Sequence, residues 1–306
     1  MTHPIDLARV LVTVCTYGRP EPLRAFLDSY VADPTTADAT LLVVDNNPDG
    51  GARATVEAYA GRRIVYAHEP RPGIAAARNR CLAGIEEDTQ AFVFVDDDEY
   101  VEPGWLGELA ACADLYGVDI VNGQVDTVFP DDAPGWVRAR GLFGYPQRET
   151  GSSDGLPATN NTLVRREAWE RAGSPGFDER FSGSGGSDTE FFWHLVNEAG
   201  CTFVWSAEAV VHEPLTPDRM SLRWAWRRHL RGGNVLGRLK LREESRAHVM
   251  LGGVGRVGKG LAGGAVTAVT GHNPSGWLVG RVARGVGMSS SAMRHVVVEY
   301  SRGGAG

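Results

Sequence analysis

Several features are scarce or absent in this chain of 306 residues, and each absence excludes a class of protein. The four cysteines lack the close spacing of a zinc site, and they are too few to cross-link a chain of this length. We interpret them as reduced thiols in the core. No apolar run reaches the roughly 20 residues of a membrane-spanning helix. The N-terminus lacks the basic start and cleavage site of a signal peptide, so we expect a cytoplasmic protein.

Basic residues are also fewer than acidic residues in this chain. The formal net charge is -7 at pH 7. Proteins that bind nucleic acid non-specifically usually present a net basic surface to the phosphate backbone, so we expect no nucleic-acid partner. Hydrophobic residues make up 42% of the chain, which is enough for one large core or two modest ones.

Short apolar runs rich in β-branched residues alternate with helix-compatible stretches in the first third of the chain. This alternation predicts an α/β protein with a parallel sheet covered by helices on both faces. The predicted strands are 10–15, 41–44, 64–66 and 92–95, and the predicted helices between them are 20–30, 52–60 and 74–85. Further on we predict helices at 105–116 and 188–198 and from about 221, and strands at 120–128 and 202–211.

Polar residues follow each of the first four predicted strands. In a parallel sheet the ligand crevice lies beyond the carboxyl ends of the strands, so these residues should converge on one site. The four segments are Thr16-Tyr17-Gly18-Arg19-Pro20, Asp45-Asn46-Asn47, Arg71-Pro72-Gly73 and Asp96-Asp97-Asp98-Glu99.

The aspartate run Asp96-Asp97-Asp98 crowds negative charge directly after a buried strand. Mutual repulsion would raise the pKa values of these carboxyl groups unless a cation were present. Carboxylate oxygens suit Mg2+ or Mn2+, which complete their coordination with substrate phosphates and water. The sequence therefore predicts a divalent-metal site that receives a nucleoside diphosphate. The alternative is an acidic turn that is simply solvated.

Six segments together resemble glycosyltransferase family 2, over roughly residues 10 to 215. They are VTVCTYGRP at 12–20, LLVVDNN at 41–47, RPGIAAARN at 71–79, FVFVDDDEYVEPGWL at 92–106, and NNTLVRRE with GSGGSDTEF further on. The order and spacing of these segments carry the resemblance. It implies a GT-A fold, with a Rossmann-like, mostly parallel sheet flanked by helices, and an inverting transfer from a nucleotide-activated sugar.

The resemblance also implies roles on the donor side. Residues Thr16, Tyr17, Arg19 and Asp45 would surround the nucleobase, and Arg78 would lie near the phosphates. Asp96 and Asp97 would approach the ribose and base, while Asp98 would bind Mg2+ or Mn2+. We expect a UDP- or dTDP-sugar as donor. The alternative for Arg19 and Arg78 is that they are ordinary surface arginines.

On the acceptor side, the family's general base matches Asp188, and Glu190 is its main rival. Local structure offers another reading, because Ser187 and Glu190 fit a capping box and an acidic first turn suits the helix dipole. By resemblance Asn160 and Asn161 lie near the donor sugar or the acceptor, or else they are buried amides in a turn. His212 would complete the metal shell, although a lone histidine is more often structural.

The chain divides by composition into two regions. Residues 1–218 are predicted to form the catalytic domain, with the nucleotide-sugar half at about 1–100 and the acceptor half at about 101–218. Residues 219–306 would form a basic, glycine-rich helical region, and no acidic residue occurs from Ser245 to Val298. This region would lie on an anionic membrane at the inner face of the cell, pair two subunits, or pack its tryptophans on the catalytic domain.

Together these features predict a metal-dependent inverting glycosyltransferase of surface-glycan or glycoconjugate biosynthesis, with a glycan, a lipid-linked molecule or a small molecule as acceptor. One alternative is a non-catalytic sugar-nucleotide binding protein. Another is a sugar nucleotidyltransferase, although its glycine-rich basic loop is missing after the first strand. A Rossmann dehydrogenase is disfavoured because no G-x-G-x-x-G follows that strand.

Overall fold

The computed structural model describes residues 3–59, 61–138, 142–181 and 185–297. Predictions for residue 60, for the run 182–184 and for residues beyond 297 lie outside the described residues. The described chain falls into two compact units. The first comprises residues 1–126, 147–179 and 187–213, and the second comprises 127–146, 180–186 and 214–306.

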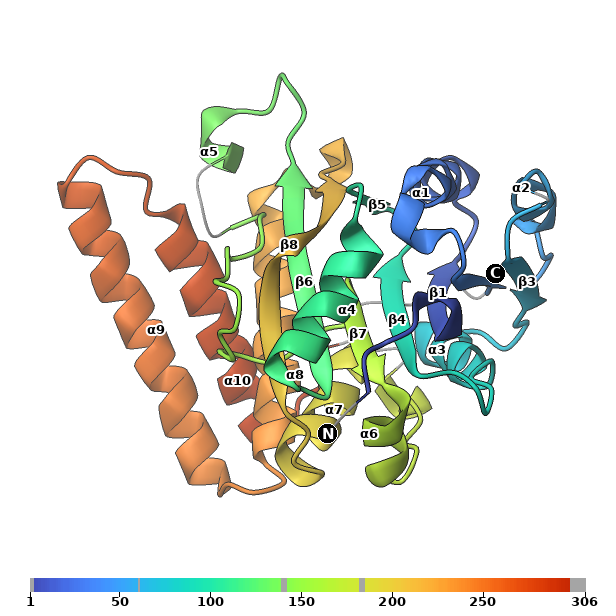
Figure 1. Ribbon diagram of the computed structural model, residues 1–306. Coiled ribbons are helices and arrows are strands. Elements are labelled where there is room, and N and C mark those ends of the chain that lie inside the picture. Colours follow the sequence, from blue (N-terminus) through green and yellow to red (C-terminus); the bar gives the residue numbers. More distant parts are fainter. Residues whose placement is uncertain (1–2, 60, 139–141, 182–184, 298–306) are drawn as a thin grey trace. The chain divides into compact units, whose positions relative to one another are not determined.

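A mixed eight-stranded sheet forms the centre of the first unit (Figure 1). Its spatial order is β3-β2-β1-β4-β7-β6-β8-β5. The neighbours among β3, β2, β1 and β4 run parallel, whereas β4–β7, β6–β7 and β5–β8 are antiparallel. The strands are β1 Val10–Thr16, β2 Thr40–Asp45, β3 Ile64–His68, β4 Ala91–Asp96, β5 Tyr100–Val101, β6 Ile120–Val128, β7 Thr162–Arg165 and β8 Phe203–Pro214.

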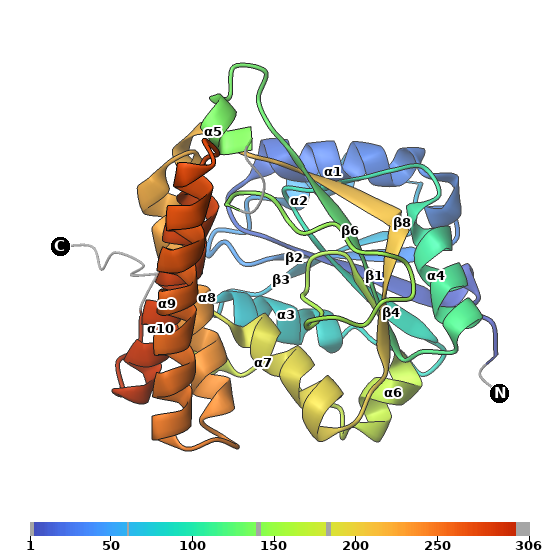
Figure 2. The ribbon, with the colours of Figure 1, turned by 90° about the vertical axis from the view of Figure 1, so that its left-hand side faces the viewer.

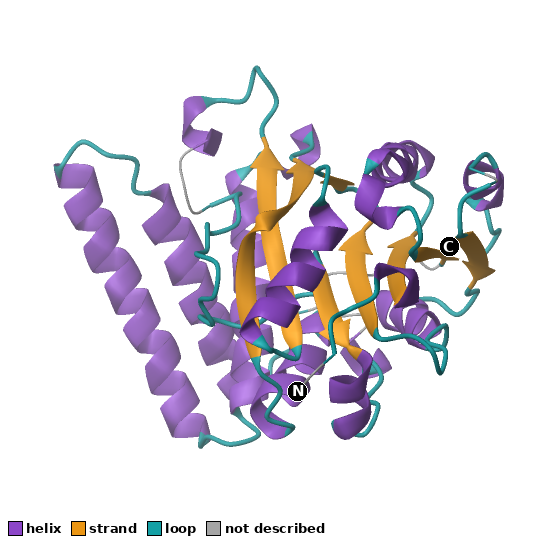
Figure 3. Cartoon of the chain, in the orientation of Figure 1, coloured by secondary structure: helices purple, strands orange, loops and turns teal. Residues whose placement is uncertain are grey.

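Helices cover both faces of this sheet, which confirms the predicted fold class. Figure 2 shows α1 above the strands and α3, α6 and α7 below them, and Figure 3 shows the same layers by element type. The helices of this part are α1 Pro20–Ala32, α2 Arg53–Glu57, α3 Ile74–Leu82, α4 Trp105–Tyr116, α6 Arg166–Arg171 and α7 Ser187–Trp193, which continues as a π-helical turn at His194–Glu198.

Helix α3 ends three residues earlier than the sequence predicts. The amides of Gly84 and Ile85 bond to carbonyls three residues back, at Cys81 and Leu82, so the chain tightens into a turn there. Helix α1 begins as expected at Pro20, whose missing N–H costs nothing at the first helical position.

One core cluster of the first unit lies between the sheet and α3, α6 and α7, on the lower side in Figure 2, and α1 and α4 bury further large side chains such as Phe26 and Trp105. Strands β1, β2 and β4 are buried along almost their whole length, as expected for parallel strands covered on both faces. All four cysteines are free thiols, and Cys81, Cys112 and Cys201 are buried, which confirms their prediction as reduced thiols.

Three long helices dominate the second unit, as predicted for a helical C-terminal region. Helices α8 Leu222–Lys240, α9 Arg246–Val269 and α10 Val282–Ala292 lie side by side, and a π-helical segment at Gly276–Arg281 precedes α10 (Figures 1 and 2). A short helix, α5 Gly135–Arg138, belongs to the same unit. No helix in the described ranges has both the length and the apolarity needed to cross a bilayer.

Glycines in this unit allow α8 and α10 to touch through their backbones. A Cβ atom at Gly233 would lie 2.1 Å from the carbonyl oxygen of Arg284, and one at Gly287 would lie 2.0 Å from that of Leu230. Both distances are too short for any side chain. The glycine-rich composition therefore serves close helix packing here.

Trp224 of α8 contributes to the core of the second unit. Its ring stacks on Phe143 at a centroid distance of 6.1 Å, and the guanidinium of Arg228 lies 5.2 Å from the centroid of Trp224. Phe143 lies in the sequence range predicted for the catalytic domain. Trp224 is thus a tryptophan of the C-terminal region that packs in a core.

Candidate active site

The carboxyl ends of β1, β2 and β4 lie side by side at the same edge of the sheet. Thr16 pairs with Asp45, and Cys15 pairs with Asp96, in the registers of β1 with its two neighbours. The polar residues that follow these strands are therefore brought to one edge, as the sequence predicts.

Two residues of the first loop bind the aspartate run. The hydroxyl of Thr16 donates to Asp97 at 2.7 Å. One guanidinium nitrogen of Arg19 lies 3.3 Å from a carboxylate oxygen of Asp97 and 2.9 Å from one of Asp98. Arg19 is thus directed into the acidic cluster, which excludes its reading as an unrelated surface arginine.

Arg78 approaches the cluster from α3. Its Nη2 lies 3.9 Å from Oδ1 of Asp96, and only 12% of the Arg78 side chain is exposed, against 45% for Asp96. A ligand can therefore reach Asp96 from solvent, while Arg78 is held beneath it by the surrounding protein.

Crowding of these carboxyl groups alters their acidity. Although the Asp96 side chain is partly exposed, desolvation by the surrounding protein raises its pKa to about 7, against the lowering effect of Arg78, and repulsion from Asp98, Glu213 and Asp97 adds to the rise. Burial likewise raises the pKa of Asp97 to about 6, although Thr16 and Arg19 oppose it. The pKa of Glu99 is raised well above its usual value, first by burial and then by Asp96. Burial is thus the main reason why these carboxyl groups hold protons more strongly than usual, and repulsion between them adds to it.

This donor set fits a divalent cation that shares its coordination with a ligand. In the described ranges, no three His, Cys, Asp or Glu side chains are grouped closely enough to hold a metal by themselves. Mg2+ and Mn2+ commonly use one or two protein carboxylates and take the other oxygens from phosphates and water. The oxygens of Asp96 and Asp98 suit that arrangement.

Asp45 is fully buried, and its carboxylate is already engaged. It accepts hydrogen bonds from the backbone amides of Asn47 (2.9 Å) and Ala52 (2.8 Å) and from the hydroxyl of Tyr66 (3.1 Å). Asp45 thus shapes the loop that follows β2. Tyr17, by contrast, is 48% exposed at the same edge of the sheet. The nucleobase role of both residues stays a prediction.

Asn46 is a structural residue of the site to which the sequence analysis gave no role. Its amide donates to the carbonyls of Glu69 and Arg71, each at 2.7 Å, and its oxygen accepts from the amide of Gly73 at 3.1 Å. Gly73 has a φ of 121° at the start of α3, the helix that carries Arg78. A buried Asn directly after an apolar strand was the available signal.

An aromatic cluster brings α7 to the same side of the sheet as Asp96. The rings of Phe177 and Phe191 stack at 4.3 Å, and both meet Phe94 edge-on, two residues before Asp96 on β4. The guanidinium of Arg78 lies 5.6 Å from the centroid of Phe177. The first turn of α7 is thereby placed beside β4 and α3.

Helical geometry distinguishes Asp188 from Glu190. Phe191 and Phe192 define the buried face of α7. An α-helix turns about 100° per residue, so Asp188 lies on that face, one turn before them, and Glu190 lies on the opposite side. Asp188 and Glu190 therefore lie on different sides of α7, and which of them acts as the base stays a prediction.

His212 pairs with Tyr100 at the β5–β8 edge of the sheet. Its ring stacks on Tyr100 at 4.9 Å, and its Nε2 lies 2.7 Å from a carboxylate oxygen of Glu102. The neighbouring Glu213 raises the pKa of Asp96 and Glu99, so this acidic residue, which the sequence analysis left without a role, belongs to the cluster. The ligand role of His212 stays a prediction.

Asn160 and Asn161 differ sharply in their surroundings. Asn161 is fully buried, and its side chain accepts from the indole of Trp105 (2.7 Å) and donates to the carbonyls of Gln124 (2.9 Å) and Ala209 (2.7 Å). The buried-amide alternative accounts for all of these bonds. Asn160 is 9% exposed, and its side chain has no hydrogen-bond partner in the described part of the protein. Of the two, only Asn160 has an amide available for a sugar.

Substitution of Asn161 by Ala should destabilise the fold rather than act on substrate. It leaves one indole N–H and two carbonyls buried without partners, so we expect a loss of about 3 kcal/mol or more in the free energy of unfolding. Urea denaturation measures this. Asn160→Ala is the matched control and should change stability by less than about 1 kcal/mol; equal losses in the two variants would contradict the assignment.

A family model described as Glycosyl transferase family 2 matches residues 11–173, which is more than half of the chain. The chain belongs to glycosyltransferase family 2. The matched range contains the aspartate run, Thr16, Arg19 and Arg78, whereas residues 187–190 lie beyond it. This glycosyltransferase is similar to the succinoglycan biosynthesis protein ExoM of Rhizobium meliloti (strain 1021), with 36% identity over 241 residues that cover 77% of this chain and 76% of ExoM.

Solved structures confirm the GT-A fold of this glycosyltransferase. The mannosyltransferase PcManGT from Pyrobaculum calidifontis, in complex with GDP-Man and Mn2+, matches with a TM-score of 0.55 at 20% identity, over 78% of this chain and 65% of PcManGT. S. aureus TarS 1-349 matches with a TM-score of 0.53 at 18% identity, over 73% of this chain and 65% of that one. TarS has also been solved in complex with UDP-GlcNAc.

Proposed function

We propose that this glycosyltransferase is metal-dependent and inverting, and that it transfers a sugar from a nucleoside diphosphate to an acceptor hydroxyl. The observation that carries the proposal is the acidic cluster at the carboxyl edge of the parallel strands. Its carboxyl groups have raised pKa values, and Arg19 and Arg78 are directed into it. Such a site can receive a cation and a diphosphate together.

On the donor side, each residue has a distinct task in this proposal. Tyr17 is exposed at the loop after β1 and would contact the nucleobase, with Thr16 and Asp45 shaping the loops around it. Asp97, held by Thr16 and Arg19, would face the ribose. Arg78 would compensate charge on the phosphates.

Asp98 would hold the divalent ion, with Asp96 beside it. When bound, the ion supplies positive charge where the departing nucleoside diphosphate gains negative charge. PcManGT, which shares the fold, was solved in complex with GDP-Man and Mn2+, and this supports the proposed use of a divalent ion.

Asp188 would accept the proton of the acceptor hydroxyl. The acceptor oxygen then forms a bond to the anomeric carbon from the face opposite the diphosphate, while the bond from that carbon to the diphosphate oxygen breaks. Attack from the opposite face inverts the anomeric configuration. Asn160 would orient a sugar hydroxyl at the same place.

We further propose a cytoplasmic role in surface-glycan or glycoconjugate assembly, with a UDP- or dTDP-sugar as donor. The similarity to ExoM, whose name assigns it to succinoglycan biosynthesis, supports the glycan acceptor. The two solved relatives bind GDP-Man and UDP-GlcNAc, which supports a nucleotide sugar without selecting its base.

A thermal-shift screen tests the donor site. UDP-, dTDP- and GDP-sugars are each added with Mn2+, with Mg2+ or with chelator. One nucleotide family should raise Tm by several degrees, since a ligand at about 100 times its Kd adds about 2.7 kcal/mol. The shift should vanish with chelator and in Asp98→Ala, which removes the metal ligand.

Asp88→Ala is the matched control for that screen. Asp88 is an exposed aspartate just before β4, at the end of the strand opposite to the cluster. This variant should keep the full nucleotide-dependent shift. Absence of any shift in the wild type, with either metal and with all three nucleotide families, would contradict the proposed donor site.

A further inference from the structure

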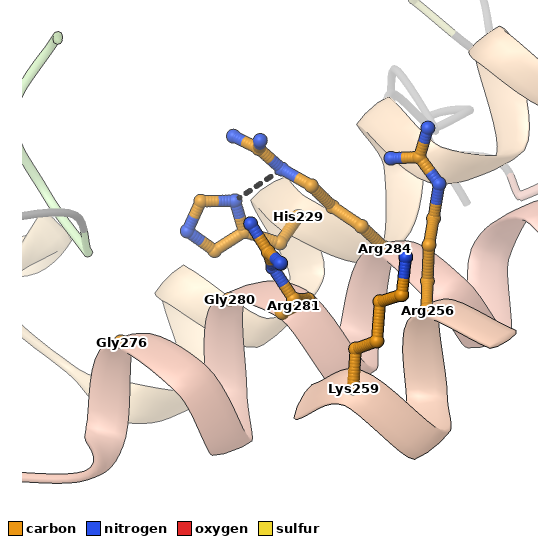
Figure 4. Close-up of a pocket in the computed structure, with 7 residues that line it drawn as sticks. All are labelled: His229, Arg256, Lys259, Gly276, Gly280, Arg281 and Arg284. Carbon is orange, nitrogen blue, oxygen red and sulfur yellow. Dashed lines mark hydrogen bonds between the residues drawn. The ribbon is translucent and has the colours of Figure 1, made fainter. Parts of the chain in front are cut away.

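The second unit contains a cavity of about 430 Å³ that is lined by basic side chains. Figure 4 shows these residues extending from neighbouring helices around one space, together with the backbone at Gly276 and Gly280. The nitrogen-bearing side chains are His229 from α8, Arg256 and Lys259 from α9, Arg281 from the π-helical segment and Arg284 from α10. Among the described residues, no carboxylate lines the cavity.

His229 orients one of these cations. Its Nε2–H donates to the carbonyl of Leu142 at 3.2 Å, and its Nδ1 accepts from Nε of Arg284 at 3.2 Å. Burial and the neighbouring Arg284 lower the pKa of His229 to about 4, so the ring is neutral and able to accept that bond. Within the part of the chain that the structure describes, Arg284 donates only through Nε, and both terminal nitrogens of its guanidinium remain for a ligand.

The positive charge of the cavity has no counterpart within the described chain. No described carboxylate lies within ion-pair distance of Arg256, Lys259, Arg281 or Arg284. The guanidinium of Arg281 lies over Trp277, 4.6 Å from the ring centroid. Burial lowers the pKa of Arg284, and repulsion from Arg256 lowers it further. Like charges gathered without an anion are unfavourable unless a ligand supplies one.

Helix α9 adds an exposed apolar face next to this cavity. Five large side chains are more than half exposed, and their spacing places them on one side of the helix: Leu251, Val254, Leu261, Val266 and Val269. Lys259, which lines the cavity, lies at the border of that face. A helix with an apolar face bordered by basic residues, and too polar to cross a bilayer, is typical of the membrane interface.

We propose that the second unit binds the phosphate-bearing headgroup of an anionic membrane lipid in this cavity and lays the apolar face of α9 on the bilayer surface. Guanidinium groups match phosphate oxygens in pairs, which explains the predominance of arginine. The apolar face favours a lipid over a free phosphate. The binding needs neither a sugar donor nor the acidic cluster, so it stands apart from the proposed reaction.

Vesicle co-sedimentation of the full chain tests the proposal. The protein should bind phosphatidylcholine vesicles that contain phosphatidylglycerol, and should bind pure phosphatidylcholine weakly. Replacing three cavity cations (Arg256→Gln, Lys259→Gln and Arg284→Gln) should weaken binding about a hundredfold. The control replaces three exposed arginines outside the cavity (Arg223→Gln, Arg227→Gln and Arg246→Gln), changes the net charge equally, and should cost less than about fivefold.

A second pair of variants keeps the test decisive if the triple cavity variant does not fold, as judged by circular dichroism. Leu251→Ser with Leu261→Ser should weaken vesicle binding at least about tenfold, since two buried apolar side chains are lost from the bilayer contact. Leu115→Ser, at a residue of α4 that is 78% exposed, should leave it unchanged.

Three results would overturn the proposal. If the triple cavity variant and the triple control variant lost equal affinity for the vesicles, any positive surface charge would suffice for binding. Equal binding to vesicles with and without phosphatidylglycerol would exclude an anionic headgroup. A rise in Tm with inorganic diphosphate that depends on the cavity cations, without vesicle binding, would assign the cavity to a soluble phosphate.

Discussion

Replacing Asp188 by Asn should lower the rate of glycosyl transfer by about 10²- to 10⁴-fold and leave donor affinity unchanged. The amide has the size of the carboxylate but cannot take the proton of the acceptor hydroxyl. Asp188 is available for that task, because it is only partly buried and no described cation forms an ion pair with it. Phe191 and its stacking partner Phe177 hold this face of α7 beside β4.

Steady-state kinetics and donor titration of the same protein preparations check this result. The fall should appear in kcat, while the nucleotide-dependent rise in Tm persists. Glu190→Gln is the matched control on the opposite side of α7, and it should keep activity within about tenfold. Loss of activity in Glu190→Gln alone would make Glu190 the base. Full activity in both variants would mean that neither of these carboxylates of α7 is the general base.

A third outcome would distinguish a glycosyltransferase from a non-catalytic sugar-nucleotide binding protein. A protein that binds the donor well but transfers no sugar, with or without Asp188, would be a sugar-nucleotide binding protein. Membership of glycosyltransferase family 2 argues against that outcome. The kinetics of Asp188→Asn are informative because they leave the donor site untouched.

The parallel half of the sheet could be predicted from the sequence because its signal is local. Strands β1, β2 and β4 are apolar runs that are almost fully buried, the edge strand β3 is partly exposed, and all four are followed by polar residues. In the antiparallel half, β6 and β8 were predicted close to their observed bounds, but the pairing of the strands was not. Strand β5 has two residues, and the four-residue β7 lies between β4 and β6, which are distant from it in the chain. Pairings of that kind depend on the tertiary fold.

The candidate site shows the same division between local and tertiary information. The aspartate run, Thr16, Arg19 and Arg78 were predicted to meet, and they do. Asn160 and Asn161 are adjacent and chemically identical, yet one has an unpaired amide and the other is saturated in the core. The positive φ of 60° at Asn161 turns its side chain inward, and no pattern in the sequence reveals that angle.

Metal-dependent donor binding should weaken as the pH falls from about 7 to 5. The pKa values of Asp96 and Asp97 are raised to about 7 and about 6, so protons compete with the cation in this range. Each carboxyl group that must lose a proton costs about tenfold in affinity per pH unit below its pKa. Titration of the nucleotide with excess Mn2+ at several pH values measures this slope. An affinity that stays constant over that range would contradict it.

The stability of the ligand-free protein should change with pH in the opposite direction. Unfolded aspartates titrate near pH 3.9, so between about pH 4 and 7 the folded protein holds protons at Asp96 and Asp97 that the unfolded chain does not. The contribution of these groups to stability is therefore present below pH 4 and is lost as the pH rises towards 7. In chelator, Tm should fall over that interval because of them.

One substitution tests the pH dependence of donor binding and the pH dependence of stability together. Asp97→Asn removes the carboxyl group that titrates near pH 6 but keeps an oxygen that can accept from Thr16. Without ligand this variant should have a flatter profile of Tm against pH than the wild type. With Mn2+ and nucleotide it should lose part of the pH dependence of binding. If only the stability profile changed, Asp97 would be a structural carboxylate outside the donor site. If both changed, the same buried carboxyl group would destabilise the empty site and take part in binding the cation and nucleotide.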